Sequence, residues 1–570
     1  MCAQYHKFSP LGDRALNVEL GNIIAEELNN EVLSLCRALE ELRVPGILEI
    51  QPAYSSLAIH FDPNVVGAPY IENLVLSVAN RLSSQENPPA AGPSEHHAYN
   101  TGETAQIPLR NENLSKSGSR IVEIPVHYGG ENGPDLGWAS EHLGVSQEEI
   151  IKRHSSKLYR VYMIGFTPGF PYLGGMDDSI ALPRLSEPRK VVPKGSVGIA
   201  GKQTGVYPWD TPGGWRLMGR TALELFSLEN HPPSLLQPGD YVKFVPIESP
   251  EVNWPADSKS NCQAISSSTM SMSVDAFAVE DPGLLTMVVD SGRFGYRKLG
   301  VPVSGAADAQ SYSLANLLCD NMRNQAVLEF TLKGPVLIAQ MDLSVAVTGA
   351  PAPITVDGVE MPPNTCFPVR KGQRLEVGSV SHGTRGYMAV AGGIQVVPVL
   401  GSRSTYLKSR FGGYQGRPLK SGDVLKAGPA PAYSAMRTFH LDLARSQFRP
   451  LNFEVFTMPY VTLKVIPGPE HTKDALKILS SEVYQVRPES DRMGIRFEGP
   501  RLLKGGADII SAPVVPGTVQ VASDGRPMLL LADSQTTGGY KRVATVVSQD
   551  LPIAAQLRAG AKVRFRTIHC

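Results

Sequence analysis

Hydrophobic and polar residues alternate in two short stretches near the start of the chain, LNVELG (16–21) and SLAIHFD (56–62), as they do in half-buried strands. Two other stretches, 25–42 and 69–82, repeat apolar residues at the spacing of an amphipathic helix. Two strands and two helices within so short a region predict a small α+β domain over residues 1–83.

The rest of the chain is dominated by short apolar runs separated by glycine and proline, a pattern typical of a turn-rich β protein. Residues 120–248 follow this pattern, with one helical stretch at 146–156. Residues 276–570 follow it as well, and we divide them into a first β-rich part, 276–450, and a second part, 451–570. These blocks predict a mainly β fold behind the α+β domain.

Two polar segments rich in Ser, Pro and Gly, residues 84–119 and 249–275, are typical of linkers. His96 and His97 lie in the first of them. A metal-binding pair is one interpretation, but no further ligand has a suitable spacing, so solvated linker histidines are the favoured one.

An internal duplication relates residues 120–248 to the end of the chain, because four segments recur in the same order at offsets of 321 to 325 residues. The pairs are PKGSVGIA (193–200) with VPGTVQVA (515–522), PGGW (212–215) with TGGY (537–540), GFPYLGG (169–175) with GIRFEGP (494–500), and LQPGDYVKF (236–244) with LRAGAKVRF (557–565). One match could arise by chance, since Gly-Pro turns recur in β proteins. Four matches in order predict two related β-barrel regions, one in each half.

Composition narrows the function classes. The 570 residues exceed the length of about 250–300 at which a single core stops growing. Lys plus Arg and Asp plus Glu are both 54, and this neutral balance counts against a nucleic-acid-binding protein. No apolar run reaches the about 20 residues of a membrane span, and the N-terminus lacks the pattern of a signal peptide.

Six cysteines are scattered along the chain without a C-x-x-C pair, which predicts free thiols in a cytoplasmic protein. They are Cys2, Cys36, Cys262, Cys319, Cys366 and Cys570.

Glycine-rich loops in the first half carry the first candidate chemistry. Residues 159–177 combine glycines with aromatic side chains, which indicates either a barrel corner, favoured on spacing alone, or an aromatic pocket rim. Residues 192–221 form a loop whose backbone N–H groups could bind an anion. Gly195 and Gly201 are one residue too far apart for a Walker A motif. Lys194 offers positive charge to a phosphate or carboxylate, and a solvated loop lysine is an equal alternative.

Arginine and aspartate flank similar loops in the second half. Arg293 and Arg403 could bind an anion. The segment SDRMGIRFEGP (490–500) offers Asp491 and Arg492, which could simply pair with each other. Asp308 directly precedes the helical stretch AQSYSLANLL, so an N-cap is its favoured interpretation.

Residues 530–546 place Asp533 and several uncharged hydrogen-bonding groups on a glycine loop after an apolar strand, which suits recognition of an amide or ureido group. The sequence contains no H-E-x-x-H, G-x-S-x-G or spaced Cys/His set, which argues against zinc hydrolysis and a nucleophile-elbow serine hydrolase. The residues alone do not identify the reaction.

The longest motifs resemble a known family. YRVYMIGFTPGFPYLGG (159–175), VPKGSVGIAGKQTGVYP (192–208) and TPGGWRLMGRT (211–221) resemble allophanate hydrolase subunit 1, also called the Kip-type inhibitor family. GRFGYRKLGVPVSGAAD (292–308), SDRMGIRFEGP (490–500) and LLADSQTTGGY (530–540) resemble the subunit 2, or antagonist, family. The resemblance covers nearly the whole chain outside the linkers and implies cyclophilin-like barrels.

Members of this family differ in function. The chain is similar to the B and C subunits of ATP-dependent 5-oxoprolinase fused together, which implies a separate A subunit as partner. One alternative is the carboxyltransferase part of urea carboxylase, a biotin enzyme, and another is a non-catalytic regulator of a sensor histidine kinase. The sequence has no M-K-M biotin attachment site and no biotin carboxylase domain, so the 5-oxoprolinase component is the leading interpretation.

The resemblance implies ATP and Mg²⁺ as cofactors and a small-molecule substrate, and it suggests no nucleic acid or membrane partner; a homo-oligomer stays open. On the matching motif positions we assign catalytic roles to Lys194, Arg293, Arg403 and Asp533. Substrate-binding roles fall to Phe170, Tyr172, Gln203, Thr204, Gly213, Gly214, Gln535, Thr536, Gly538, Gly539 and Tyr540. Nucleotide- or metal-binding roles fall to Asp308, Asp491 and Arg492.

Overall fold

The computed structural model of the chain describes residues 6–84, 113–114, 120–187, 189–248, 273–430, 451–505 and 508–568. His96, His97, Cys2, Cys262, Cys570 and most of the two predicted linkers lie outside these residues. The chain divides into two compact units. Unit 1 comprises Met1–Phe8 with Val18–Trp254, and unit 2 comprises Ser9–Asn17 with Pro255–Cys570.

The N-terminal region contains a four-stranded sheet in the order β1-β2-β4-β3 and two helices. Its elements are β1 (Lys7–Pro10), β2 (Ala15–Glu19), α1 (Glu26–Glu41), β3 (Ile47–Pro52), β4 (Ser56–Phe61) and α2 (Ala68–Ser84). Helix α1 buries an apolar stripe that includes Val32, Leu35 and Leu39, the spacing from which the helix was predicted. Both predicted helices and both predicted strands are confirmed.

The rest of unit 1 is a closed barrel of seven strands, because β6 pairs with β13 on one side and with β14 on the other. Around the barrel the strands are β6 (Arg120–Tyr128), β13 (Arg216–Arg220), β10 (Ser196–Ala200), β11 (Gln203–Val206), β8 (Pro171–Gly174), β7 (Leu158–Ile164) and β14 (Tyr241–Pro246). Beside it lie β5 (Asn113–Leu114), α3 (Leu136–Leu143), α4 (Gln147–Ser156) and a two-stranded ribbon of β9 (Arg189–Val192) and β12 (Thr211–Gly213). We call it barrel 1.

Unit 2 begins with a β sandwich, since one buried apolar cluster contains residues of two separate sheets, among them Phe277, Leu337, Leu328 and Val345. The first sheet comprises β21 (Val359–Glu360), β20 (Ile354–Val356), β23 (Arg374–Val377), β18 (Val336–Ala339), β15 (Val274–Asp281), β26 (Val424–Ala427) and β25 (Ile394–Gln395). The second comprises β16 (Thr286–Val289), β17 (Val327–Thr331), β24 (Arg385–Val390), β19 (Leu343–Gly349) and β22 (Cys366–Val369). Helix α5 (Ala309–Leu318) packs on the outer face of this second sheet.

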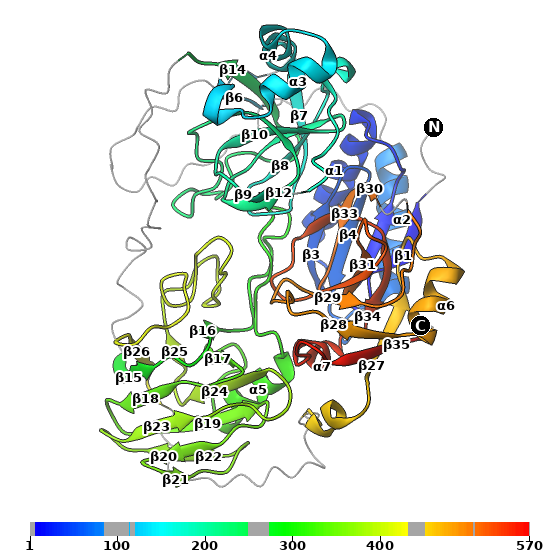
Figure 1. Cartoon of the computed structure of the whole chain (residues 1–570). Coiled ribbons are helices and arrows are strands. Elements are labelled where there is room, and N and C mark those ends of the chain that lie inside the picture. The colour runs from blue at the N-terminus through cyan, green and yellow to red at the C-terminus, as the bar shows by residue number, and fades with distance from the viewer. Residues whose placement is uncertain are drawn as a thin grey trace. The chain divides into compact units, whose positions relative to one another are not determined.

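Unit 2 ends with a second closed barrel, barrel 2, drawn in orange and red in Figure 1. Its strands are β27 (Val461–Pro467), β34 (Arg542–Val546), β31 (Thr518–Val521), β32 (Pro527–Leu530), β29 (Gly494–Glu498), β28 (Val483–Val486) and β35 (Lys562–Thr567). It also has helices α6 (Lys473–Ser481) and α7 (Leu551–Ala555) and a ribbon of β30 (Asp508–Pro513) and β33 (Thr537–Tyr540).

The two barrels share one topology, strand for strand. In each, the first and last strands are parallel neighbours, β6 with β14 and β27 with β35. The aligned glycines Gly195 and Gly517 both adopt positive φ, +84° and +96°, in the turn that leads into the third strand of the ring. The predicted duplication and the mainly β fold class are therefore confirmed.

Among the described residues, Cys36 and Cys319 are buried and Cys366 is partly buried, and none of these three forms a disulfide bond. Within the same residues, no helix combines the length and the apolar character needed to cross a membrane.

Candidate functional site

The aromatic segment of barrel 1 forms a packed corner. Phe170 is buried, and its ring lies 5.2 Å from the rings of Tyr172 and Tyr207 and 5.6 Å from that of Trp215. Gln203 donates from Nε2 to the Tyr54 hydroxyl over 2.6 Å. These contacts agree with the barrel-corner interpretation, and they bring Phe170, Tyr172 and Gln203 into one region.

Thr204 belongs to a buried hydrogen-bond chain that sequence reasoning missed. Its Oγ1 donates to the Gly198 carbonyl over 3.0 Å, so it accepts from His154 Nε2 at 2.9 Å. His154 Nδ1 is then an acceptor for the Tyr128 hydroxyl at 2.7 Å. Burial lowers the pKa of His154 to about 3, which keeps the imidazole neutral.

Lys194 lies at the surface of barrel 1. Its Nζ pairs with Glu224 Oε1 at 2.8 Å and lies 5.7 Å from the centre of the Trp209 ring. Gly213 ends β12, and the carbonyl of Gly214 accepts a hydrogen bond from the Leu185 amide over 2.7 Å. The two glycines thus belong to the ribbon that flanks the barrel.

A cluster of buried charged side chains lies in unit 2, where the sandwich contacts barrel 2. Arg492 donates from Nε to Asp533 Oδ2 over 2.9 Å, from Nη2 to the Gly305 carbonyl over 2.8 Å, and from Nη1 to Glu329. Tyr387 donates its hydroxyl to the other Glu329 oxygen over 2.8 Å. Burial alone would raise the pKa of Glu329, but the guanidinium groups of Arg492 and Arg385 hold it below its ordinary value.

Asp308 connects to the same region as a helix cap. Its carboxylate accepts from the Gln310 and Ser311 amides at the start of α5, at 3.1 and 2.9 Å, and from Gln556 Nε2 of barrel 2 at 2.8 Å. Burial raises the pKa of this carboxyl. The N-cap interpretation is confirmed, and Gln556 is a partner that the sequence did not indicate.

Asp491 and Arg492 do not pair with each other, so that interpretation is wrong. The Asp491 carboxylate accepts from the backbone amides of Met493 and Gly494, at 2.8 and 3.2 Å. This turn directs the neighbouring Arg492 side chain inward to Asp533 and Glu329, where two carboxylates compensate its charge.

Arg293 and Arg403 both lie beside Asp290, which sequence reasoning missed. Arg293 is 1% exposed and donates from Nε to the Val399 carbonyl over 3.2 Å; burial lowers its pKa to about 10. The Arg403 amide donates to Asp290 Oδ2 over 2.5 Å. The Ser402 and Ser404 hydroxyls bind the other Asp290 oxygen.

The Gly-Gly-Tyr loop of barrel 2 is organised around Gln520. Gln535 Nε2 donates to Gln520 Oε1 over 3.4 Å, and Gln520 Nε2 donates to the Tyr540 carbonyl over 3.3 Å. A Cβ on Gly538 would lie 2.5 Å from Gln520 Nε2, so a larger residue there would displace this amide. Thr536 precedes the ribbon strand β33, which contains Gly538, Gly539 and Tyr540.

A cavity of about 490 Å³ in unit 2 brings three predicted residues together. Asp491, Arg492 and Asp533 line it together with Arg385, Lys408, Arg487 and Arg558. Five cationic and two anionic side chains give this lining an excess of positive charge. Leucine, isoleucine and methionine side chains line the cavity as well, together with Thr331, Thr384, Pro488, Ser490 and Ala559. We call it the cationic cavity; it is suited to a small anion with an apolar body.

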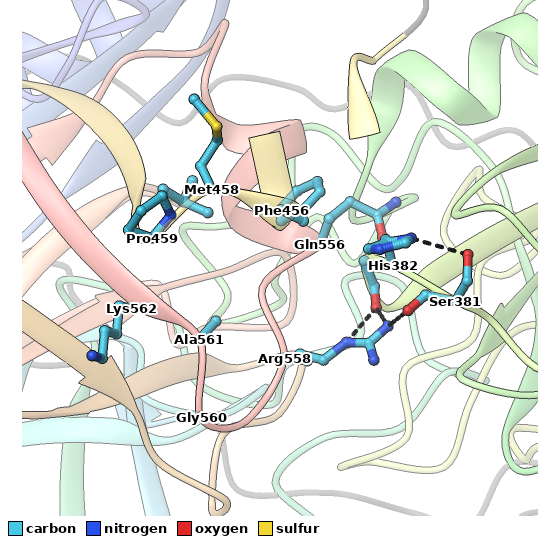
Figure 2. A pocket seen from close by; sticks show the side chains of 12 residues that line it. Ser381, His382, Phe456, Met458, Pro459, Gln556, Arg558, Gly560, Ala561 and Lys562 are labelled. Carbon is cyan, nitrogen blue, oxygen red and sulfur yellow. Dashed lines mark hydrogen bonds between the residues drawn. The ribbon is translucent and has the colours of Figure 1, made fainter. Parts of the chain in front are cut away.

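A smaller cavity of about 320 Å³ lies nearby in unit 2 and shares Arg558 (Figure 2). There the Arg558 guanidinium donates to the Gly383 carbonyl over 2.9 Å and to the Ser381 carbonyl over 3.2 Å. Phe456 and Met458 lie on the opposite side. Two cationic side chains, Arg558 and Lys562, line this cavity, against five in the cationic cavity.

The carboxylates predicted to bind a metal do not form a cation site in the described part of the chain. That part contains no group of three or more His, Cys, Asp or Glu placed to hold a metal ion. Asp308 is occupied by four hydrogen bonds, and the Asp491 carboxylate accepts from the backbone amides of Met493 and Gly494. A protein-bound Mg²⁺ is therefore not supported at these residues.

Paired seven-stranded barrels, one of them joined to a β sandwich with a cationic cavity, define a protein of carboxyltransferase-domain architecture. The family model for carboxyltransferase domain, subdomain C and D, matches residues 6–236, and the model for subdomain A and B matches residues 299–567. The solved structure of TTHA0988 superposes with a TM-score of 0.77 and 34% identity, covering 97% of this chain and 99% of that one.

The curated relatives divide between the two halves. One region is 42% identical over 250 residues to the B subunit of 5-oxoprolinase from Bacillus subtilis, covering 42% of this chain and 93% of the relative. Another is 35% identical over 288 residues to the C subunit of 5-oxoprolinase from Escherichia coli, covering 50% of this chain and 88% of the relative. Urea amidolyase of Lachancea kluyveri is 32% identical over 317 residues, which is 17% of its length. The chain belongs to the carboxyltransferase-domain family that contains the B and C subunits of 5-oxoprolinase, and it joins the equivalents of both, as the resemblance predicted.

Proposed function

We propose that this chain is the fused B and C component of an ATP-dependent 5-oxoprolinase. The observation that carries the proposal is the presence, in one polypeptide, of near-complete equivalents of two subunits named for the same enzyme. Their designation as subunits implies a multi-subunit enzyme, and we infer a separate A subunit as the remaining partner. A role in hydrolysis agrees with the names of these relatives and of urea amidolyase.

The reaction explains why ATP is required. A lactam is resonance-stabilised, so water opens it slowly. Transfer of the γ-phosphoryl group to the lactam oxygen activates the ring carbon for addition of water; the carbon–nitrogen bond then breaks, and a second water releases phosphate. One 5-oxoproline, one ATP and two waters thus give L-glutamate, ADP and phosphate. Positive groups fixed near the developing charge supply most of such catalysis, with Mg²⁺ arriving on the nucleotide.

The cationic cavity is the part of the structure best suited to this chemistry. It is the larger of the two cavities described, it is bordered by buried charges, and it includes the catalytic candidate Asp533. Lys194, Arg293 and Arg403 stay predictions, as do the substrate-binding roles in barrel 1 and in the Gly-Gly-Tyr loop.

The decisive experiment measures ATP cleavage by the full chain mixed with a purified A subunit. We expect ADP and glutamate to form only when 5-oxoproline and both proteins are present. The neutral lactam 2-pyrrolidinone and each protein alone are the controls. If ADP production is the same with and without 5-oxoproline, the proposed function is wrong.

A biotin-dependent carboxyltransferase is the second candidate, favoured by the descriptions of both matching family models and by the similarity to urea amidolyase. Because this chain has no M-K-M biotin site, carboxybiotin would come from another protein. Carboxylation of urea by the full chain supplied with a carboxylated biotin carrier, without any 5-oxoproline-dependent ATP cleavage, would favour this alternative.

A further inference from the structure

The cationic cavity contains a buried arginine whose donors are not all used. Arg385 is 6% exposed and lines the cavity, and it donates from Nη1 to the Ala555 carbonyl. Its Nε has no hydrogen-bond partner among the described residues, and the nearest carboxylate oxygen, Glu329 Oε1, lies 3.7 Å away. A buried N–H of a charged group without a partner carries a desolvation penalty that an anionic ligand would relieve.

The other cations of the cavity differ in how fully they are engaged. Arg492 is held by Asp533, Glu329 and the Gly305 carbonyl, and Arg558 by two backbone carbonyls. Arg487 pairs with Glu489 at 3.2 Å. Lys408 is exposed, and its side chain forms no hydrogen bond or ion pair with another described residue. Arg385 and Lys408 are therefore the two cations with capacity for a ligand.

Apolar side chains line the cavity together with the charged ones. They belong to Leu285, Leu332, Leu407, Met493, Leu531 and Leu557. A phosphate group alone would gain little from these side chains, whereas a small ring with methylene groups would bury apolar surface against them. No glycine is among the residues that line the cavity, so no glycine backbone of the kind that cradles phosphates faces it.

From this arrangement we infer that the cationic cavity is the binding site for the carboxylate of a small cyclic acid, with Arg385 and Lys408 as its anchors. The inference deepens the proposed function and rests on it for the identity of the acid, 5-oxoproline. The carboxylate lies between the two cations, and the ring packs on the leucine side chains. The ion pair between Arg492 and Asp533 fixes part of the cavity wall.

The test is calorimetric titration of the full chain with 5-oxoproline and with 2-pyrrolidinone, which has the same lactam ring but no carboxylate. We expect 2-pyrrolidinone to bind at least about tenfold more weakly, the equivalent of one charge-assisted hydrogen bond. Arg385→Lys should weaken 5-oxoproline binding about tenfold or more, and Lys408→Met about fivefold. Lys408 is exposed, so its variant keeps the test valid if Arg385→Lys fails to fold.

Lys562→Met is the matched control, because it removes an exposed lysine from the smaller cavity of the same unit (Figure 2). It should leave 5-oxoproline binding unchanged. Titration with inorganic phosphate and ADP provides the second arm. Loss of phosphate or ADP binding in Lys408→Met, with 5-oxoproline binding retained, would assign the cavity to a phosphoryl group and overturn the inference.

The remaining outcomes separate this inference from the proposed function. If the wild-type chain with its A subunit cleaves ATP in response to 5-oxoproline, yet both variants bind the acid as the wild type does, the cavity assignment fails and the function stands. If 5-oxoproline binds in a Lys408-dependent manner but no ATP is cleaved, the function fails and the carboxylate site stands. Equal binding of 2-pyrrolidinone and 5-oxoproline would also overturn the carboxylate anchor.

Discussion

Barrel 1 and barrel 2 connect the same two loops in different ways. In each barrel, the loop before the fifth strand of the ring, β8 or β29, meets the loop after the fourth strand, β11 or β32. In barrel 1, Trp209 Nε1 in the second loop donates to the Pro168 carbonyl in the first over 2.9 Å. In barrel 2, Arg492 in the first loop forms an ion pair with Asp533 in the second at 2.9 Å. Barrel 1 thus has a neutral hydrogen bond at the position where barrel 2 has a buried ion pair.

This difference shows what the duplicated fold fixes and what it leaves free. Strand order and the glycine turns are common to both barrels, whereas the loop chemistry has diverged, as is usual where a scaffold supports different sites. In barrel 2 the ion pair continues through Arg492 to Glu329 of the sandwich, so the barrel and its neighbour share one buried charge network. Barrel 1 instead buries a neutral histidine chain.

The largest predicted effect comes from breaking the network of barrel 2. Arg492→Met removes the cation that pairs with both buried carboxylates and leaves Glu329 with only the more distant Arg385, which should lower the free energy of unfolding by about 3–5 kcal/mol. Urea denaturation, with hydrogen exchange of β29 and β32 to locate the change, measures it. Adding Glu329→Gln and Asp533→Asn should recover part of the loss. If Arg492→Met alone costs less than about 1 kcal/mol, the network is not a stabilising charge cluster.

Acid should affect the barrels over different pH ranges. His154 has a folded pKa of about 3 and an unfolded pKa of about 6.5, so the unfolded state takes up a proton that the folded state does not. The contribution of neutral His154 to the free energy of unfolding is complete above pH 6.5. It is lost as pH falls from there toward 3, by up to about 1.4 kcal/mol per pH unit. The pKa of Glu329 is lowered in the folded state. The contribution of its carboxylate to the free energy of unfolding is therefore lost only as pH falls below the unfolded-state pKa of 4.5.

Hydrogen exchange at pH 7.5 and 5.5 tests this difference. Strands β6 and β7 of barrel 1 should lose protection at pH 5.5, and β29 and β32 of barrel 2 should lose much less, after correction for intrinsic exchange rates. His154→Gln should reduce the acid response of barrel 1. A parallel loss of protection in both barrels would show that the buried histidine is not its source.

Sequence patterns predicted the local elements well and the charge network poorly. Helices α1, α2 and α5 follow from apolar spacing and from the Asp308 cap, and the duplication follows from repeated glycine turns. Glu329 was missed because its partner Arg492 is 163 residues away, and periodicity says nothing about which distant residues meet. The sequence did contain a signal for Glu329, because a single carboxylate interrupts the apolar strand Val327–Thr331. Arg385 and Asp290 were missed for the same reason.

A smaller effect should follow from the equivalent change in barrel 1. Trp209→Phe removes the hydrogen bond to the Pro168 carbonyl but keeps an aromatic ring near Phe226, whose ring centre lies 6.1 Å from that of Trp209. Losing one neutral hydrogen bond should cost about 1 kcal/mol. Denaturation beside the Arg492→Met variant measures the contrast. A loss as large as that of Arg492→Met would mean that the two loop junctions are energetically alike.

The smallest effect on stability is expected from Lys194→Ala. Because this variant should stay folded, a loss of its activity can be assigned to the missing side chain. The ion pair of Lys194 with Glu224 joins side chains that are 27% and 52% exposed, and such pairs contribute at most about 1 kcal/mol. Lys194→Ala should therefore fold normally. If Lys194 stabilises the transferred phosphoryl group, 5-oxoproline-dependent ATP cleavage should fall about a hundredfold or more.

The matched control is Lys202→Ala in the same loop, where the ion pair with Asp178 joins side chains that are 71% and 68% exposed. Removing Lys202 tests whether any loop cation matters or Lys194 specifically does. If both variants retain wild-type activity, Lys194 is a solvated loop lysine and barrel 1 supplies no cation to the reaction from this loop. If only Lys194→Ala loses activity, barrel 1 supplies a specific cation to the reaction from this loop.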